Sequence, residues 1–341
     1  MKVTGKKVLI AGGAGFIGSH LVDVLAPLNK VTVVDNLSND SWNNIREHVE
    51  RGTIEFIKAD IRDEERMTEV VKGKEVIFNL AVQCLRISIG DPLLVHEVNA
   101  TGSLNLCMAA MKNGIERFVY ISSSEVYGTA KKVPMDEEHP LEPTTPYGAS
   151  KLAGEAYVRA YHRTFGLPVV VVRPFNTYGP REHMGGPYGE VIPRFVVRCL
   201  NGLPPVIFGD GEQTRDFTEV TDTARGIVEA SECDSLVGET VNIGAGHEVS
   251  INEIARIISE LLGMDMPPAH LAPRPGDVRR HLADISKAHQ LFNFSPQTTI
   301  VKGIEHYIGW LKNQDLELDH LQREAVLLNW IKEPKRSYVG I

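Results

Sequence analysis

A tyrosine and a lysine four residues apart are the pair in this sequence best suited to acid–base chemistry. Tyr147 and Lys151 follow Pro146, a residue favoured in the first turn of a helix, so both should lie on one helix face. A phenol has an ordinary pKa of about 10, and a neighbouring positive charge favours its ionised form. We therefore expect Tyr147 to remove or return a hydroxyl proton near neutral pH.

Hydroxyl and carboxyl groups come directly after a strand-like run at residues 117–122. They belong to Ser123, Ser124 and Glu125. If that run is a strand of a parallel sheet, its carboxyl end should face the same crevice as Tyr147. Glu125 then has two interpretations. It is either a second acid–base group or a structural residue paired with a loop cation such as Arg181.

A glycine-rich turn supplies a candidate phosphate cradle. Gly12, Gly15 and Gly18 follow the apolar run 7–11, and a helix pattern begins at Phe16. Glycines allow a tight turn and close approach of a pyrophosphate, which meets the free N–H groups and positive end of the helix. Asp35 ends the next apolar run and can accept hydrogen bonds from ribose hydroxyls. This combination predicts NAD rather than NADP.

The elements that must position these groups follow from short apolar runs separated by helical patterns. The runs are residues 7–11, 31–35, 54–59, 75–81, 117–122 and 168–173, and the clearest helical stretches are 92–113 and 147–165. Continuous β-branched runs indicate strands covered on both faces. We predict an α/β fold with a doubly wound parallel (Rossmann) sheet, which binds ligands beyond the carboxyl ends of its strands.

The pattern loosens after about residue 175, where glycine and proline become frequent. We predict a dinucleotide-binding domain at 1–175 and a smaller substrate lobe mainly at 176–312. Segments around 212–246 should return to the first domain, because 240–244 reads as a further core strand. Residues 313–341 have the spacing of an amphipathic helical tail.

Composition excludes several classes of protein. The 341 residues include 36 Lys and Arg against 44 Asp and Glu, a net charge of −8, so nucleic-acid binding through bulk charge is not expected. No apolar run is long enough to span a membrane, and the four cysteines are isolated, which favours a cytoplasmic enzyme with reduced thiols. The histidines show no metal-binding spacing, so no metal is expected.

Taken together, these motifs resemble the extended short-chain dehydrogenases/reductases, and more narrowly the NAD-dependent nucleotide-sugar epimerases and dehydratases. The resemblance covers residues 5–312 and includes GGAGFIGSH, SSSEVYG, YGASK and RPFNTYGP. It implies that Ser123 bonds the reacting sugar hydroxyl, Tyr147 is the base and Lys151 its partner. The NAD contacts expected are Gly12, Gly15, Phe16, Ile17, Gly18, Asp35, Asn36, Asp60, Ile61, Ala81, Tyr147 and Lys151. The substrate contacts expected are Ser123, Ser124, Asn176, Arg181, Phe208, Arg215, Arg274 and Asp277.

The resemblance implies transient oxidation of a nucleotide-diphosphate sugar at C4, with three possible fates of the 4-keto sugar. Our first interpretation is a 4-epimerase. The alternatives are a 4,6-dehydratase or a UDP-uronic acid decarboxylase using Glu125, a net reductase, or a non-catalytic NAD-sensing scaffold. Ser124-Glu125 departs from the commonest epimerase pattern, in which the place of Glu125 is not acidic, and Ser124 departs from the acid found at its place in one group of dehydratases. Arg86, Arg181 and His183 are further candidates for the sugar pocket, and relatives pair through two helices, which implies a homodimer.

Overall fold

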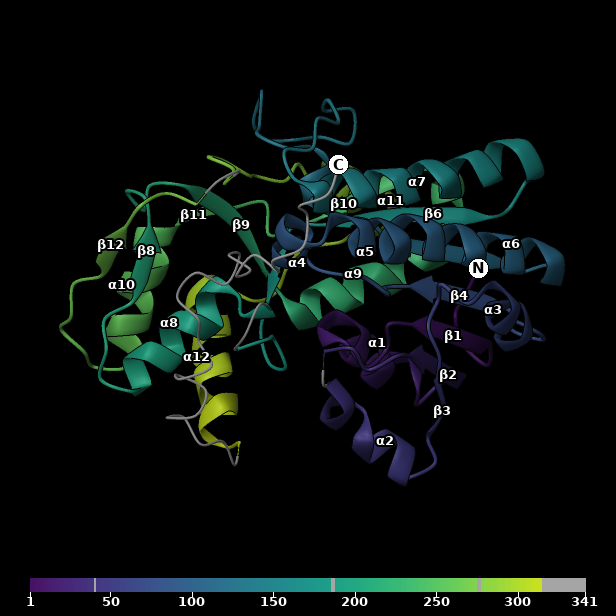
Figure 1. The fold of residues 1–341 in the computed structure, drawn as a ribbon, viewed down its shortest axis with the longest axis horizontal. Coiled ribbons are helices and arrows are strands. Elements are labelled where there is room, and N and C mark those ends of the chain that lie inside the picture. The colour runs from purple at the N-terminus through teal and green to yellow at the C-terminus, as the bar shows by residue number, and fades with distance from the viewer. Residues whose placement is uncertain (40, 185–187, 275–276, 315–341) are drawn as a thin grey trace, which may run out of the picture.

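A seven-stranded parallel sheet forms the centre of the computed structural model, which describes residues 1–39, 41–184, 188–274 and 277–314 (Figure 1). The strand order is β10-β6-β5-β4-β1-β2-β3, so the chain winds outward in both directions from β1. The strands are β1 (Lys7–Ala11), β2 (Lys30–Asp35), β3 (Ile54–Lys58), β4 (Val76–Asn79), β5 (Arg117–Ile121), β6 (Val169–Pro174) and β10 (Thr240–Ile243). The predicted doubly wound fold is confirmed.

Helices cover both faces of this sheet, which explains the continuous apolar runs. Alternate strand residues such as Ile10 pack with α1 and α9 on one face, and their neighbours such as Leu9 pack with α3, α6 and α7 on the other. The helices on this part of the chain are α1 (Phe16–Leu25), α2 (Arg46–Glu50), α3 (Glu64–Val70), α4 (Leu85–Gly90), α5 (Pro92–His96), α6 (Ser103–Asn113), α7 (Pro146–Phe165), α9 (Val220–Glu232) and α11 (Ser286–Phe292).

The single helix predicted over 92–113 is divided in the structure. A π-helical segment, η2 (Glu97–Gly102), separates α5 from α6. The wider turn accompanies a side-chain contact, since Asn99 accepts a hydrogen bond from the backbone N–H of Gln83 at 2.8 Å and donates one to its carbonyl at 3.1 Å. Apolar spacing does not register such a local change of pitch, and π-helical turns often occur at functional sites.

A smaller lobe lies beside the carboxyl edge of the large sheet, to the left in Figure 1. Its own apolar core joins two small sheets and three helices. The strands are β7 (Asn176–Tyr178), β8 (Val206–Phe208), β9 (Thr214–Glu219), β11 (Glu248–Ser250) and β12 (Ala269–Leu271), and the helices are α8 (Val191–Leu200), α10 (Ile251–Leu261) and α12 (Ile300–Lys312).

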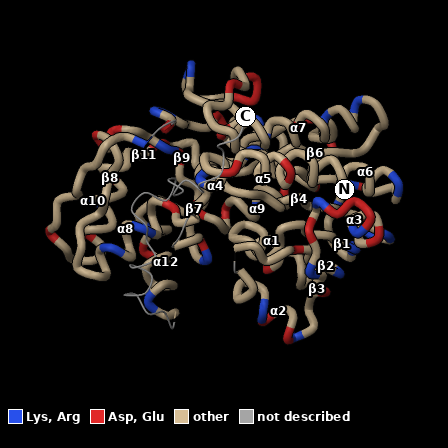
Figure 2. The backbone as a smooth tube through the Cα atoms, viewed as in Figure 1, with Lys and Arg blue, Asp and Glu red and all other residues tan. Residues whose placement is uncertain are grey.

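The chain crosses between the two parts more than once. Within the predicted returning segment, α9 and β10 pack with the large sheet, whereas β9 pairs with β7 and β11 in the lobe. The predicted helical tail lies outside the described residues beyond Gln314. In the part of the chain that is described, no helix combines the length and apolar character required to cross a membrane. Figure 2 shows acidic and basic positions interspersed around the periphery.

Candidate active site

The turn between β1 and α1 has the geometry of an anion cradle. Gly12 adopts a left-handed conformation (φ 78°), and a Cβ atom on Gly18 would lie only 2.2 Å from the Gly12 carbonyl oxygen. The N-cap of α1 is Gly15, which offers no side chain to the helix. The N-terminal N–H groups of α1 are therefore left to a ligand, and an anion fits there. Phe16 and Ile17 line the cleft in front of them.

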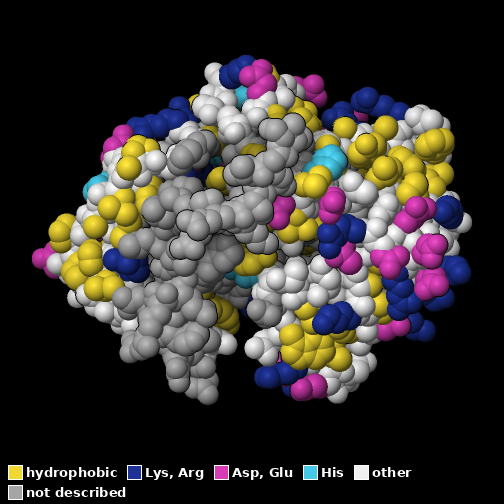
Figure 3. Space-filling model, viewed as in Figure 1, with side chains coloured by type: hydrophobic (Ala, Val, Ile, Leu, Met, Phe, Trp, Pro, Cys, Tyr) yellow, Lys and Arg dark blue, Asp and Glu magenta, His cyan; other side chains and the backbone are white. Residues whose placement is uncertain are grey.

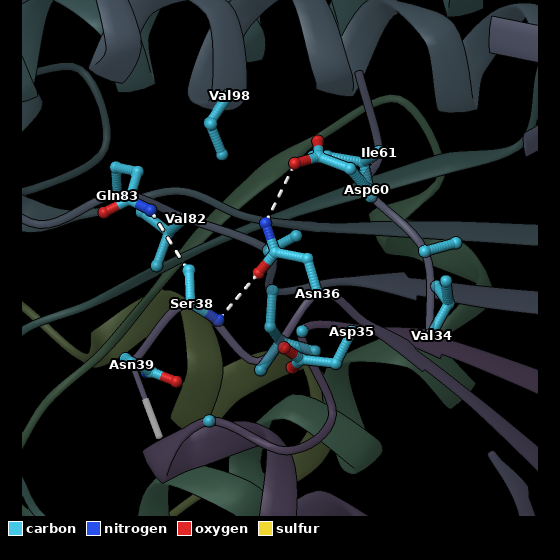
Figure 4. A pocket seen from close by; sticks show the side chains of 15 residues that line it. Val34, Asp35, Asn36, Ser38, Asn39, Asp60, Ile61, Val82, Gln83 and Val98 are labelled. Atoms are coloured by element: carbon cyan, nitrogen blue, oxygen red, sulfur yellow. Dashed lines mark hydrogen bonds between the residues drawn. The ribbon is translucent and has the colours of Figure 1, made fainter. Parts of the chain in front are cut away.

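A polar pocket continues from the cradle across the ends of β2 and β3 (Figure 4). The Asp35 carboxylate accepts hydrogen bonds from the N–H groups of Ala14 at 3.1 Å and Leu37 at 2.9 Å. Burial raises the pKa of Asp35, and these bonds oppose that change. Asn36 donates to Asp60 at 2.9 Å on the opposite wall. The lining also includes Gly12, Gly15, Ile61 and Ala81, which were expected, and Ser38 and Gln83, which were not.

Helix α7 delivers the predicted base into the cleft. The helix begins under a cap, in which the Thr145 hydroxyl accepts from the N–H of Gly148 at 3.1 Å, with Pro146 in the first turn. Tyr147 lines the cleft together with Ser123. Burial raises the pKa of Tyr147 well above its ordinary value, and the Ser123 side chain acts in the opposite direction.

Lys151 lies on the same helix face but donates a hydrogen bond to a backbone carbonyl. Its Nζ donates to the Ile121 oxygen at 2.6 Å and lies 4.5 Å from the centre of the Tyr120 ring. The side chain is almost fully buried, and burial lowers the pKa of Lys151 to about 7, against the opposing charge of Glu155. Among the protein's own groups, burial therefore has the largest effect on the pKa of both Tyr147 and Lys151.

Contacts that sequence reasoning missed hold α7 in place. Asn99 of η2 donates to the Ser150 hydroxyl at 2.9 Å, between the two catalytic candidates on the helix. A Cβ atom on Gly154 would meet the Tyr120 hydroxyl at 2.4 Å and the Asn99 carbonyl at 2.6 Å, so only glycine permits this approach. The tyrosine hydroxyl in turn donates to the Lys151 carbonyl at 3.1 Å. Nothing in the local sequence pattern signals these long-range contacts.

A buried ion pair one turn beyond Lys151 joins α7 to β5 and β6. Arg173 is fully buried and its Nε donates to Glu155 at 3.1 Å, while the Ser122 hydroxyl donates to the same carboxylate at 2.8 Å. A buried charge needs such a partner, and removing one member is costly. The pair fixes the register of the helix that carries Tyr147.

Glu125 lines the cleft beside Ser123, at the start of the short helix η3 (Ser124–Val126). Its N–H donates to the Ser123 hydroxyl at 3.2 Å. Burial raises the pKa of Glu125, and the charges of Arg215 and Arg274 oppose that rise. Among the described residues, Glu125 makes no ion pair. The carboxyl group is thus available to chemistry inside the cleft.

Arg181 is the predicted substrate contact that the structure places elsewhere. Its guanidinium pairs with Asp23 of α1 at 2.7 Å, and its backbone is left-handed (φ 67°). It does not line the described pockets, whereas its neighbour His183 does. The suggested pairing of Arg181 with Glu125 is therefore wrong. The partner is a helix residue far away in sequence, which spacing alone does not reveal.

The lobe contributes a second pocket, on the far side of Tyr147 from the cradle. Arg215 and Arg274 both donate to the same oxygen of Asp277, at 2.7 and 2.8 Å. Two guanidinium groups share one carboxylate, so positive charge remains for an anion such as a diphosphate. Asn176 lies beside them with its side-chain oxygen buried and unbonded within the described chain. The lining also includes Phe208, as expected, and Glu190, Arg194 and Gln213, which were missed.

These pockets form one continuous cleft along the carboxyl edge of the sheet. The central part contains Ser123, Tyr147 and Lys151. It shares Gly12 and Gly15 with the pocket next to β2, and Asn176, Arg215 and Arg274 with the pocket in the lobe. The arrangement suits a dinucleotide on one side, a second phosphorylated ligand on the other, and a proton-transfer group between them.

Comparisons with known proteins agree with this geometry. Residues 8–244 match the model of the NAD dependent epimerase/dehydratase family. A putative UDP-glucose 4-epimerase of Methanocaldococcus jannaschii is 38% identical, with 90% of this chain and 99% of that protein covered. A dTDP-glucose 4,6-dehydratase of Actinoplanes is 33% identical over 90% of this chain and 98% of that protein.

The fold comparison gives the same result. A solved UDP-N-acetylglucosamine 4-epimerase of Methanobrevibacter ruminantium, in complex with UDP-N-acetylmuramic acid, matches with a TM-score of 0.86. It is 36% identical and covers 92% of this chain and 100% of that one. The chain therefore belongs to the NAD-dependent epimerase/dehydratase family, and its cofactor is NAD. Its relatives include proteins named as epimerases, dehydratases and decarboxylases, so the family does not select one reaction.

Proposed function

We propose that the chain is a nucleotide-diphosphate-sugar 4-epimerase. The observation that carries the proposal is the position of Tyr147, which lines the cleft together with Ser123, the NAD cradle and the arginine pair of the lobe. A sugar whose diphosphate lies against Arg215 and Arg274 brings its ring toward Tyr147. Ser124 supports epimerisation, since its hydroxyl is a poor proton donor to a departing hydroxyl group at this place.

In the proposed reaction, the Tyr147 oxygen removes the proton of the sugar 4-hydroxyl and later returns it. Ser123 holds that hydroxyl and the phenol in one hydrogen-bonded arrangement. NAD, when bound, would accept a hydride from C4 of the sugar and later return it. The positive charge of its nicotinamide ring would favour the ionised form of Tyr147, which burial in the protein disfavours. Epimerisation requires the 4-keto sugar to present its other face before the hydride returns, while Arg215 and Arg274 keep the diphosphate in place.

Turnover in heavy water tests this proposal. We expect the enzyme to interconvert the two C4 epimers of a nucleotide sugar without incorporating solvent deuterium at carbon, as read by proton NMR. A panel of UDP, dTDP, GDP and CDP sugars identifies the nucleotide. Failure to turn over any of them favours the NAD-sensing scaffold, and stoichiometric consumption of NADH favours a reductase; both outcomes contradict the proposal.

A 4,6-dehydratase is the second candidate, because Glu125 supports it. The carboxyl group lies in the cleft beside Ser123 with a raised pKa, which suits a base that removes the sugar C5 proton and holds it. Loss and return of that proton would place solvent deuterium in the product. The heavy-water experiment therefore separates the two candidates in one spectrum.

We also propose that the enzyme is a homodimer. Within residues 92–113, Val98 and Leu106 are buried in the subunit core, whereas the Leu93 side chain of α5 is 66% exposed. Phe165, at the end of α7, is 58% exposed. Figure 3 shows hydrophobic side chains gathered over the end of α6 and α7. Pairing these helices with a second copy would cover them. Sedimentation velocity tests the proposal, and a monomer at micromolar concentration contradicts it.

A further inference from the structure

An ion pair spans the cleft between α4 and the start of α8. Arg86 donates from Nη1 to the Glu190 carboxylate at 3.2 Å, and its Nη2 bonds the other oxygen of that carboxylate and the Tyr188 carbonyl, the latter at 2.9 Å. The Arg86 side chain is only 6% exposed. Both charged residues line the central cleft as well as the lobe pocket. The pair thus lies on the path between the diphosphate site and Tyr147, where the sugar ring must lie.

Both terminal nitrogens of the Arg86 guanidinium group are already engaged. They bond to a carboxylate and a carbonyl in the fork geometry that would otherwise hold a carboxylate ligand. The charge of Arg86 also keeps the pKa of Glu190 below its usual range, although burial acts in the opposite direction. Glu190 is therefore ionised near neutral pH, and the pair as a whole is neutral.

Apart from the arginine pair assigned to the diphosphate, the other groups that line the central cleft add little positive charge for a ligand. Glu125 and Glu182 are two more carboxyl groups that line the cleft, and burial raises the pKa of both. Burial lowers the pKa of His183, so its ring is neutral near pH 7. The remaining cations that the structure describes in the lining of the central cleft are Lys151, Arg215 and Arg274, which donate to a carbonyl or to Asp277. Arg194 lines the lobe pocket instead.

This charge balance makes a carboxylate on the sugar costly. A uronic acid could pair with these two nitrogens of Arg86 only by displacing Glu190, which would separate an existing ion pair and bring two like charges together. A hydroxymethyl group at C5 carries no charge, so it can bind without separating the Arg86–Glu190 pair. We propose that the Arg86–Glu190 pair selects nucleotide sugars with an uncharged substituent at C5 and rejects nucleotide uronic acids. The inference rests on the proposed function, which places a nucleotide sugar in this cleft. If it holds, the enzyme is neither a uronic acid decarboxylase nor a uronic acid epimerase.

The test is a ratio of dissociation constants, measured by titration calorimetry on the NAD-loaded enzyme with UDP-glucose and UDP-glucuronic acid. Both probes carry the same nucleotide, so any preference for another base cancels in the ratio. We expect the wild-type enzyme to bind UDP-glucose at least about tenfold more tightly. In Glu190→Gln, which frees the charge of Arg86 with little change of shape, the ratio should shift by about tenfold or more toward UDP-glucuronic acid.

Two variants test the cause of that shift. Glu229→Gln breaks a half-exposed Arg–Glu pair with Arg225 on α9, away from the cleft, and should leave the ratio unchanged. The double variant Arg86→Met/Glu190→Gln removes both charges and should lose the gain for UDP-glucuronic acid. A gain that persists in the double variant would overturn the role of Arg86.

The wild-type result is decisive even where a variant fails to fold. Binding of UDP-glucuronic acid as tight as that of UDP-glucose, or tighter, overturns the inference. Selective binding of UDP-glucose followed by dehydration rather than epimerisation would contradict the proposed function and leave the selection by charge intact. The two failures are therefore distinguishable.

Discussion

The two halves of the cleft are built by different means. On the NAD side, the backbone turn between β1 and α1 and the end of β2 provide the contacts, and Asp35 bonds Ala14 only 21 residues away. On the substrate side, ion pairs join segments that are distant in sequence: Arg215 and Asp277 are 62 positions apart, and Arg86 and Glu190 are 104 positions apart. One half is encoded in a local motif, whereas the other exists only after the lobe has folded onto the sheet.

Tyr147 lies where the halves meet, so its loss should have the largest effect. We expect Tyr147→Phe to lower kcat by about 10³-fold or more, because the group that removes and returns the hydroxyl proton is gone. Bound NAD should remain, since the cradle is untouched. Tyr161→Phe, on the same helix but outside the cleft lining, is the matched control and should keep its activity. Near-normal turnover by Tyr147→Phe would contradict the assignment of Tyr147 as the base.

A single added carbon atom in the glycine-rich turn should weaken NAD binding. In Gly18→Ala, the new Cβ would lie 2.2 Å from the Gly12 carbonyl oxygen, which is backbone and has no room to yield. We expect at least about a tenfold loss of NAD affinity, measured by fluorescence titration after removal of the bound cofactor. Gly309→Ala in α12 is the control, because its Cβ would have no neighbour within 4 Å. The control should gain up to about 1 kcal/mol of stability. Equal NAD affinity in the two variants would show that the cradle is not built as described.

The burial of Lys151 should appear in the pH dependence of stability. Its pKa is lowered from 10.5 to about 7, so between these values the unfolded chain binds more protons than the folded one. The cost of burying the charge is complete below pH 7 and disappears as the pH rises toward 10.5. We expect Lys151→Met to stabilise the protein most below pH 7, with a gain that shrinks by up to about 1.4 kcal/mol per pH unit above it. Urea unfolding across this range would contradict the shift if the gain stayed constant or grew.

Glu125 should give the smallest effect if the enzyme is an epimerase. Glu125→Gln keeps the shape of the side chain, and epimerisation needs no proton transfer at C5, so kcat should change by no more than about threefold. A dehydratase would lose about 10²-fold or more with its C5 base. Glu142→Gln, in an exposed ion pair with Lys131, is the matched control for the same substitution. Steady-state assays of both variants with one substrate give the comparison.

The sequence indicated the NAD half well, because its signals are local. Continuous β-branched runs fixed the strands to within a residue or two, and the turn from Gly12 to Gly18 needs no distant partner to be recognised. The π-helical segment around Asn99 was not foreseen, since apolar spacing is nearly the same with or without it. Arg181 was assigned to the wrong place because its partner, Asp23, is chosen by the folded lobe.

The substrate half could be predicted only as a set of candidate residues. Arg86 was among them, but its pairing with Glu190 depends on where the N-cap of α8 lies in the folded chain, which no motif encodes. The same holds for the sharing of Asp277 by two arginines. Specificity therefore depends on the contacts that a linear motif describes least.

The central claim, that hydride leaves and returns at C4 beside Tyr147, can be tested by following one label. The enzyme is incubated with a nucleotide sugar carrying deuterium at C4, in ordinary water, and the product is examined by deuterium NMR. The account predicts that the product is the C4 epimer with the label still at C4. A label transferred to C6, or lost to solvent, would contradict it.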